Sequence, residues 1–128
     1  MRDFLVLYIL ALLVFAVIDF FWLGFAARKL YRSQIGFLLK DNFDFKAAVI
    51  FYLLYILGLV FFVINRATSW QSALFPGLFF GLITYATYDL TNQATIKDWP
   101  LKVTLIDLVW GSFIAGATSL ITFLIIGG

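Results

Sequence analysis

The chain has 128 residues, of which 64% are hydrophobic and 12% are charged, with a net charge of +2 and a mean hydropathy of +1.04. Soluble domains carry about 25% charged residues, so this chain has too little polar surface to cover a water-facing globule. Cysteine and histidine are absent, which excludes disulfides, thiolate nucleophiles, an imidazole base and zinc sites of the usual kind. No basic patch is interleaved with aromatics, so we expect no nucleic-acid partner. The composition indicates an integral membrane protein.

Four apolar segments follow one another along the chain. They cover residues 4–27, 47–64, 72–92 and 101–126. Each is near or above the roughly 20 residues that an α-helix needs to cross the hydrocarbon core. The first lacks the cleavage pattern of a signal peptide, and the apolar runs do not alternate as barrel strands do. The sequence therefore predicts an all-α membrane protein, with residues 1–128 forming one domain of four transmembrane helices in a compact antiparallel bundle.

The basic residues predict an orientation. The connections between helices one and two and between helices three and four, with their flanks, hold seven of the nine Lys and Arg: Arg28, Lys29, Arg32, Lys40, Lys46, Lys97 and Lys102. The opposite side holds Arg2 and Arg66. Because cytoplasmic loops retain positive charge, we expect both basic connections to be cytoplasmic and both termini to be external, in a bacterial inner membrane.

Three of the seven acids, Asp19, Asp89 and Asp107, lie inside predicted spans. Connectivity places all three toward the same membrane face, about 8 to 14 Å inward from the nearest basic flank. An Asp at mid-helix costs about 2.5 to 3.5 kcal/mol to insert, whereas polar contacts between helices contribute only about 0.6 kcal/mol each. We interpret the three as a functional pocket, with Asp89 as the central acid or base and the other two as charge partners. The alternative is that they hold the helices together by hydrogen bonds.

A metal site is not favoured. Enzymes that bind diphosphates through Mg²⁺ bring several acids together on one segment, whereas here each helix supplies one. We expect no metal and no cofactor.

Helical spacing extends the site on the third span. Tyr85, Asp89 and Asn92 are four and three residues apart and share a face. We predict that Tyr85, Tyr88 and Asn92 donate hydrogen bonds to a ligand.

Small residues continue that face. Gly77 and Gly81 form a GxxxG pair, two turns and one turn before Tyr85, respectively. The fourth span presents Gly111 and Ala115 after Asp107. Such rows let two membrane helices approach closely. We predict that the third and fourth spans pack along them.

Tryptophans fall into two groups. Trp22 and Trp110 each follow an Asp of a predicted span by three residues, where an indole can donate to a carboxylate or line a pocket, so we predict that they bind ligand. Trp70 and Trp99 lie at span edges, so we predict that they belong to the interfacial aromatic belt.

The first basic connection, RKLYRSQIGFLLKDNFDF, has an apolar face at helical spacing in Tyr31, Ile35, Leu38 and Leu39. Such a segment would lie on the membrane surface over the polar layer. A simple extension of the first helix is the other interpretation.

Several motifs together resemble a known family. They are DxxWLG at Asp19, FYLLY at Phe51, YATYDLTNQAT with WP from Tyr85 to Pro100, and DLVWG at Asp107. Over essentially the whole chain they resemble the bacterial family of predicted membrane proteins called domain of unknown function 2177. The resemblance implies a membrane protein and favours a lipid context, because relatives are often encoded near lipid-modifying enzymes. It supplies no catalytic residues to carry over.

The leading hypothesis is a protein that binds or modifies the headgroup of a membrane lipid or other amphiphile near the cytoplasmic face. Two alternatives remain. A membrane carboxylate could serve a small proton-coupled transporter. The glycine-lined faces would also suit a non-catalytic accessory subunit, either in a homo-oligomer or on a larger membrane enzyme.

Overall fold

The computed structural model describes residues 3–38 and 45–126. Its helices are α1 (Phe4–Trp22), α2 (Arg28–Ile35), α3 (Phe45–Leu59), α4 (Trp70–Thr95) and α5 (Leu101–Ile126). Two π-helical turns, Leu23–Ala27 and Val60–Ile64, extend α1 and α3, and a 3₁₀ turn, Gly36–Leu38, ends α2. Arg2, Leu39 and Lys40, which the sequence arguments use, lie outside the described residues.

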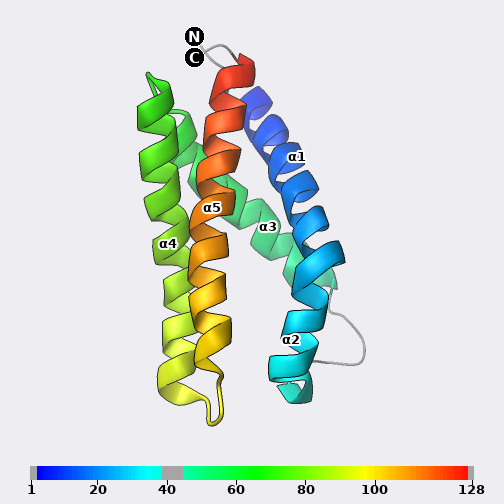
Figure 1. The fold of residues 1–128 in the computed structure, drawn as a ribbon. Helices are drawn as coiled ribbons and strands as arrows, with labels where there is room; N and C mark the ends of the chain where they lie inside the picture. Colours follow the sequence, from blue (N-terminus) through cyan, green and yellow to red (C-terminus); the bar gives the residue numbers. More distant parts are fainter. Residues whose placement is uncertain (1–2, 39–44, 127–128) are drawn as a thin grey trace.

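The predicted all-α fold is confirmed. The described ranges contain no strand. Four helical segments are long and apolar enough to cross a membrane: Phe4–Phe25, Phe45–Ile64, Trp70–Thr95 and Leu101–Ile126. They form an antiparallel bundle in which α2 and the α4–α5 connection lie at one end (Figure 1). We call this the basic end, because Arg28, Lys29, Arg32, Lys97 and Lys102 lie there.

The third span is longer at both ends than the sequence predicts. It starts earlier because Ser69 and Ser72 form a capping box, in which each hydroxyl accepts the other residue's backbone N–H. It ends at Thr95, whose hydroxyl donates to the Thr91 carbonyl at 2.8 Å. This bond within the helix satisfies a side chain that would otherwise favour a turn. The polar sequence after Asp89 is therefore helical.

The closest helix pair is α4 and α5, which run antiparallel side by side (Figure 1). A Cβ atom on Gly77 would lie 2.7 Å from Ser119 Oγ, and one on Gly81 would collide with the carbonyl of Gly111. The backbones therefore touch where the small residues face each other. Ala115 contributes to the same contact with its Cβ and its carbonyl oxygen. This approach fixes the register between the two helices.

The apolar core joins α1, α3 and α5. Leu7, Ala11 and Phe15 from α1 pack against Ile56 and neighbouring residues of α3. Helix α3 crosses the others obliquely (Figure 1). The aromatic ring of Phe15 contacts those of Tyr52 and Tyr55, with centroids 5.6 and 5.3 Å apart. Two tyrosines of α3 are therefore drawn into the bundle at mid-span.

Helix α2 continues α1 rather than starting a separate surface helix. In an unbroken α-helix at about 100° per residue, Tyr31 would point about 120° away from Asp19. A π-turn accommodates one extra residue, so Leu23–Ala27 reduces that difference to about 20°. Tyr31 and Ile35 consequently pack with Trp99 and Val103, whereas Leu38 is exposed.

A closed set of hydrogen bonds shapes the α4–α5 connection. The Trp99 indole N–H donates to Thr104 Oγ1 at 3.1 Å, and the Thr104 hydroxyl donates to Gln93 Oε1 at 2.8 Å. Gln93 Nε2 completes the set by donating to the Trp99 carbonyl at 2.9 Å. Trp99 is only 6% exposed, so its indole faces the protein, whereas Trp70 is 47% exposed at its span edge. The predicted place of both in the aromatic belt stays a prediction. The buried partner Thr104 is what draws the Trp99 indole inward.

Replacing Gly81 by alanine should destabilise the bundle. The added methyl group would overlap the Gly111 backbone, which cannot yield as a flexible side chain can. Overpacking of this kind costs about 1 to 3 kcal/mol. We expect a lower apparent melting temperature in mild detergent, measured by far-UV circular dichroism.

Gly24→Ala is the matched control for this substitution, because no atom lies within 4 Å of the position its Cβ would take. Its melting temperature should stay near that of the natural chain. Equal effects of the two substitutions would show that α4 and α5 are not in backbone contact at Gly81.

Candidate functional site

The three membrane carboxyls lie toward the basic end on three different helices. Asp19 is on α1, Asp89 on α4 and Asp107 on α5, and all three are buried. Asp89 and Asp107 interact directly with each other. Asp19 lies beside the indole of Trp110, one turn along α5 from Asp107. Neither Asp89 nor Asp107 acts on Asp19, so the structure pairs two of the three predicted acids directly. We call the three residues the carboxyl cluster.

Asp89 is the most enclosed member of the cluster. Its exposed fraction is 0%, and neither of its carboxyl oxygens receives a hydrogen bond. Its polar neighbour Asp107 is itself a carboxyl, which can donate only when it carries a proton. Two carboxylates in contact in a medium of low dielectric constant cannot both be ionised without a large cost. The pair is therefore most stable with one proton shared between the two side chains.

Tyr31 covers the Asp107 side of this pair. Its hydroxyl donates a hydrogen bond to Asp107 Oδ1. Burial, and then the Asp107 carboxyl, raise the pKa of Tyr31 above its ordinary value of 10.0. The hydroxyl thus keeps its proton throughout the physiological range. This contact ties α2 to α5 directly over the cluster.

Asp19 has one donor of its own, and an indole N–H without a hydrogen-bond partner lies beside it. The Tyr52 hydroxyl donates to Asp19 Oδ2, and the Trp110 indole N–H lies beside the same carboxyl. The rings of Trp110 and Trp22 stack at 4.5 Å with planes 14° apart. The Trp22 side chain in turn lies beside the Tyr31 hydroxyl. The two tryptophans therefore link Asp19 to the cover over Asp107.

Tyr85 packs where α4 and α5 are closest. Its side chain occupies the space that a Cβ on Gly111 would need. Its ring meets that of Tyr55 edge-on at 6.3 Å, and it lies within electrostatic range of Asp19 and Tyr31. The Thr84 hydroxyl donates to Tyr55 at 3.3 Å. Hydroxyl groups thus extend from the cluster toward the middle of the bundle.

Two predicted ligand-binding residues lie at the margin. Tyr88 is 59% exposed, and its ring meets Trp99 edge-on at 6.0 Å. Asn92 is partly buried and lies next to the Tyr88 hydroxyl, one turn further along α4. The structure brings Tyr85, Trp22 and Trp110 to the cluster, and it does not bring Tyr88 into the interior.

No positive charge compensates the cluster within the described ranges. The groups that act on the three carboxyls are one another, tyrosines and Trp110, and none is a Lys or Arg. In the same ranges, no three acidic side chains are arranged to hold a metal ion. A carboxyl pair that shares a proton can both release and accept one, which is the chemistry of general acid and base catalysis. Uncompensated carboxyls also attract a cation.

Sequence reasoning missed Tyr31 and Tyr52 as members of the site. Tyr52 lies in the apolar run FYLLYIL, where a phenol at mid-span is the signal that could have marked it. Tyr31 was placed on the apolar face of a surface segment. Its true direction depends on the π-turn at Leu23–Ala27, for which the sequence offers no comparable signal.

Removing the Tyr31 hydroxyl should loosen α2. A hydrogen bond to a charged group contributes about 1.5 to 3 kcal/mol, so Tyr31→Phe should speed hydrogen–deuterium exchange of the amides in Arg28–Ile35. Because the folded-state pKa of Tyr31 is raised, this stabilisation is fully present below about pH 10 and is lost as the pH rises through the raised value. In the natural chain, α2 should therefore stay protected at moderately alkaline pH.

Tyr8→Phe is the control, because the Tyr8 hydroxyl donates to the Leu53 carbonyl, away from α2. It should leave exchange in α2 unchanged. Unchanged α2 exchange in Tyr31→Phe as well would mean that the Tyr31 contact with Asp107 does not hold α2.

Comparison with known proteins gives one match. No curated protein and no solved structure matches the chain. The model of the family described as "Predicted membrane protein (DUF2177)" matches residues 4–124, nearly the whole chain, and includes all three carboxyls of the cluster. The resemblance seen in the sequence motifs is confirmed, and the chain belongs to this family of membrane proteins.

Proposed function

We propose that this protein binds the headgroup of a lipid or related amphiphile at the carboxyl cluster. The observation that carries the proposal is Asp89, which is fully buried with two oxygens that receive no donor. Buried polar groups are normally hydrogen-bonded, and an exception calls for a specific reason. A bound headgroup would supply the missing donors. Structural glue would need only the proton that Asp89 shares with Asp107, and this leaves the remaining acceptors of Asp89 without donors.

An apolar hollow beside the cluster supports a ligand with an acyl chain. It has a volume of about 440 Å³ and opens along α5. It is lined by Trp22, Leu105, Ile106, Val109, Trp110 and Phe113. Its two tryptophans are those that adjoin Asp19 and Tyr31, so the hollow and the cluster share a wall. An acyl chain in this hollow would place its headgroup next to the carboxyls.

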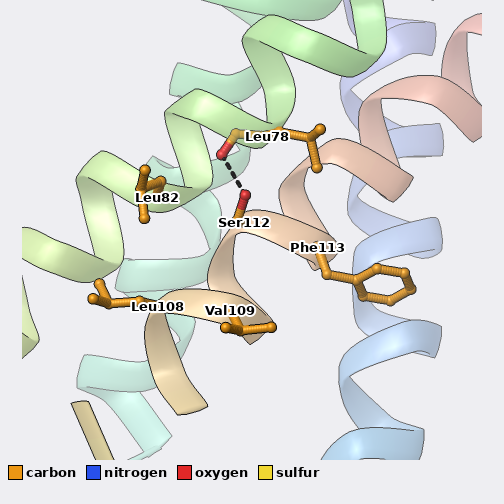
Figure 2. A pocket seen from close by; sticks show the side chains of 6 residues that line it. All are labelled: Leu78, Leu82, Leu108, Val109, Ser112 and Phe113. Atoms are coloured by element: carbon orange, nitrogen blue, oxygen red, sulfur yellow. Dashed lines mark hydrogen bonds between the residues drawn. The ribbon is translucent and has the colours of Figure 1, made fainter. Parts of the chain in front are cut away.

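The neighbouring hollow between α4 and α5 fits a headgroup less well. It has a volume of about 390 Å³, and five of its six lining residues are apolar (Figure 2). The polar one, Ser112, donates to the Leu78 carbonyl at 2.9 Å, so its hydrogen-bonding capacity is already used. Val109 and Phe113 line both hollows. This second surface suits contact with lipid tails alone.

The positive-inside rule supports a location of the proposed site in the inner leaflet. Arg28, Lys29, Arg32, Lys97 and Lys102 lie at the basic end, whereas Arg66 lies in the α3–α4 connection at the opposite end. On this rule, the basic end faces the cytoplasm. The headgroup would then come from a cytoplasmic-leaflet lipid of a bacterial inner membrane.

Asp89→Asn should reduce lipid binding without unfolding the protein. The Asn amide can donate to Asp107 and so replace the shared proton, but it lacks the charge and one of the acceptors. We expect at least about a tenfold loss of lipid that co-purifies in mild detergent, measured by native mass spectrometry.

Asp98→Asn makes the same chemical change in an exposed turn. Its φ of 64° lies in the left-handed region, which Asn tolerates well. It should retain the lipid. Equal lipid content in both variants, with both folded, would refute the assignment of the site to Asp89.

A further inference from the structure

We infer that the headgroup carries a primary ammonium, which Asp89 and Asp107 bind through its N–H groups. This inference rests on the proposed function and names the class of ligand that the site takes. The hydroxyls of Tyr31 and Tyr52 already donate to Asp107 and Asp19, and the Trp110 indole N–H, which has no partner, lies beside Asp19 and not beside Asp89. No hydroxyl, amide or indole group donates to either buried oxygen of Asp89. The ligand must therefore bring hydrogen-bond donors of its own.

The charge of the site also favours a cation. Three carboxyls lie on α1, α4 and α5, and the described ranges bring no Lys or Arg into contact with them. In a medium of low dielectric constant, an anionic headgroup would be repelled by an ionised carboxylate. A cation among these groups forms charge-assisted hydrogen bonds, which are roughly twice as strong as neutral ones. An ammonium fits, and an anionic or neutral polyol headgroup does not.

The aromatic residues disfavour a quaternary ammonium. Such cations have no N–H group, and proteins bind them against the open faces of aromatic rings. Here Trp22 and Trp110 stack on each other at 4.5 Å, so each covers a face of the other. Tyr85 is packed against Gly111. A trimethylated nitrogen would thus leave Asp89 without donors and would find no aromatic cage in their place.

Basic side chains at the basic end could bind a phosphate next to the ammonium. Arg28 lies one turn before Tyr31 on α2, Arg32 directly follows it, and both are exposed. Lys102, also exposed, lies near the start of α5, five residues before Asp107. The basic side chains lie at the surface and the carboxyls lie in the interior. This arrangement matches a phosphoethanolamine headgroup whose phosphate points outward and whose amine points inward. The ammonium would take the place that the Tyr31 hydroxyl holds beside Asp107.

The test compares phospholipids that differ only in their headgroup nitrogen. Delipidated protein in mild detergent is titrated with phosphatidylethanolamine, its N-methyl and N,N-dimethyl derivatives, phosphatidylcholine and phosphatidylglycerol, all with the same acyl chains. Binding is followed by native mass spectrometry. Affinity should fall stepwise as N–H groups are replaced by methyl groups. Phosphatidylethanolamine should bind about tenfold or more tightly than phosphatidylcholine or phosphatidylglycerol.

Two variants assign the preference to the cluster. Asp89→Asn and Asp107→Asn should each bring phosphatidylethanolamine and phosphatidylcholine to similar affinities, whereas Asp98→Asn should keep the natural preference. Using both cluster variants, each checked for folding by its melting temperature, keeps the test valid if one of them fails to fold.

The outcomes separate this inference from the proposed function. If phosphatidylcholine or phosphatidylglycerol binds as tightly as phosphatidylethanolamine, in a manner that still depends on Asp89, the ammonium is refuted and the headgroup site stands. If no lipid binds with dependence on Asp89, the headgroup site itself is refuted.

Discussion

The backbone contact between Gly81 on α4 and Gly111 on α5 is the constraint on which the rest of the structure depends. Two helices this close leave little room for side chains between them, so residues one or two turns further along must face each other directly. On α4 this residue is Asp89, and on α5 it is Asp107. Because the Tyr85 side chain of α4 lies against Gly111 of α5, one further turn along each antiparallel helix brings Asp89 to Asp107.

Two adjacent layers at the basic end of this helix pair differ in how their buried polar groups are satisfied. Near the α4–α5 connection, Gln93, Trp99 and Thr104 satisfy one another in a closed set of hydrogen bonds. One turn further into the bundle, no hydroxyl, amide or indole group donates to Asp89, and the side chain that it meets there is a second carboxyl, Asp107. Buried polar side chains are thus paired with neutral donors in one layer and not at Asp89 in the next. This contrast is why we read the carboxyl cluster as a site and the Trp99 set as structure.

The spans and the common depth of the acids could be predicted from sequence because they depend on local properties. Apolar length defines a membrane helix, and connectivity alone puts Asp19, Asp89 and Asp107 toward one face. The features that could not be predicted depend on tertiary partners. The inward direction of the Trp99 indole depends on Thr104, which accepts its N–H. Tyr52 looks like one more apolar position until Asp19 is seen to face it.

The π-turn at Leu23–Ala27 separates two helical registers within one continuous segment. Before the turn, packing in the apolar core determines which face of α1 points inward. After the turn, the contact of Tyr31 with Asp107 determines which face of α2 points inward. A one-residue insertion of this kind is a common origin of π-turns near functional sites. Adding or removing one residue in this turn would rotate α2 by about 100° and bring different side chains over the carboxyls. The sequence of the membrane-spanning core would not have to change. Family members that differ by one residue here would share the bundle and present different side chains to the same pair of acids.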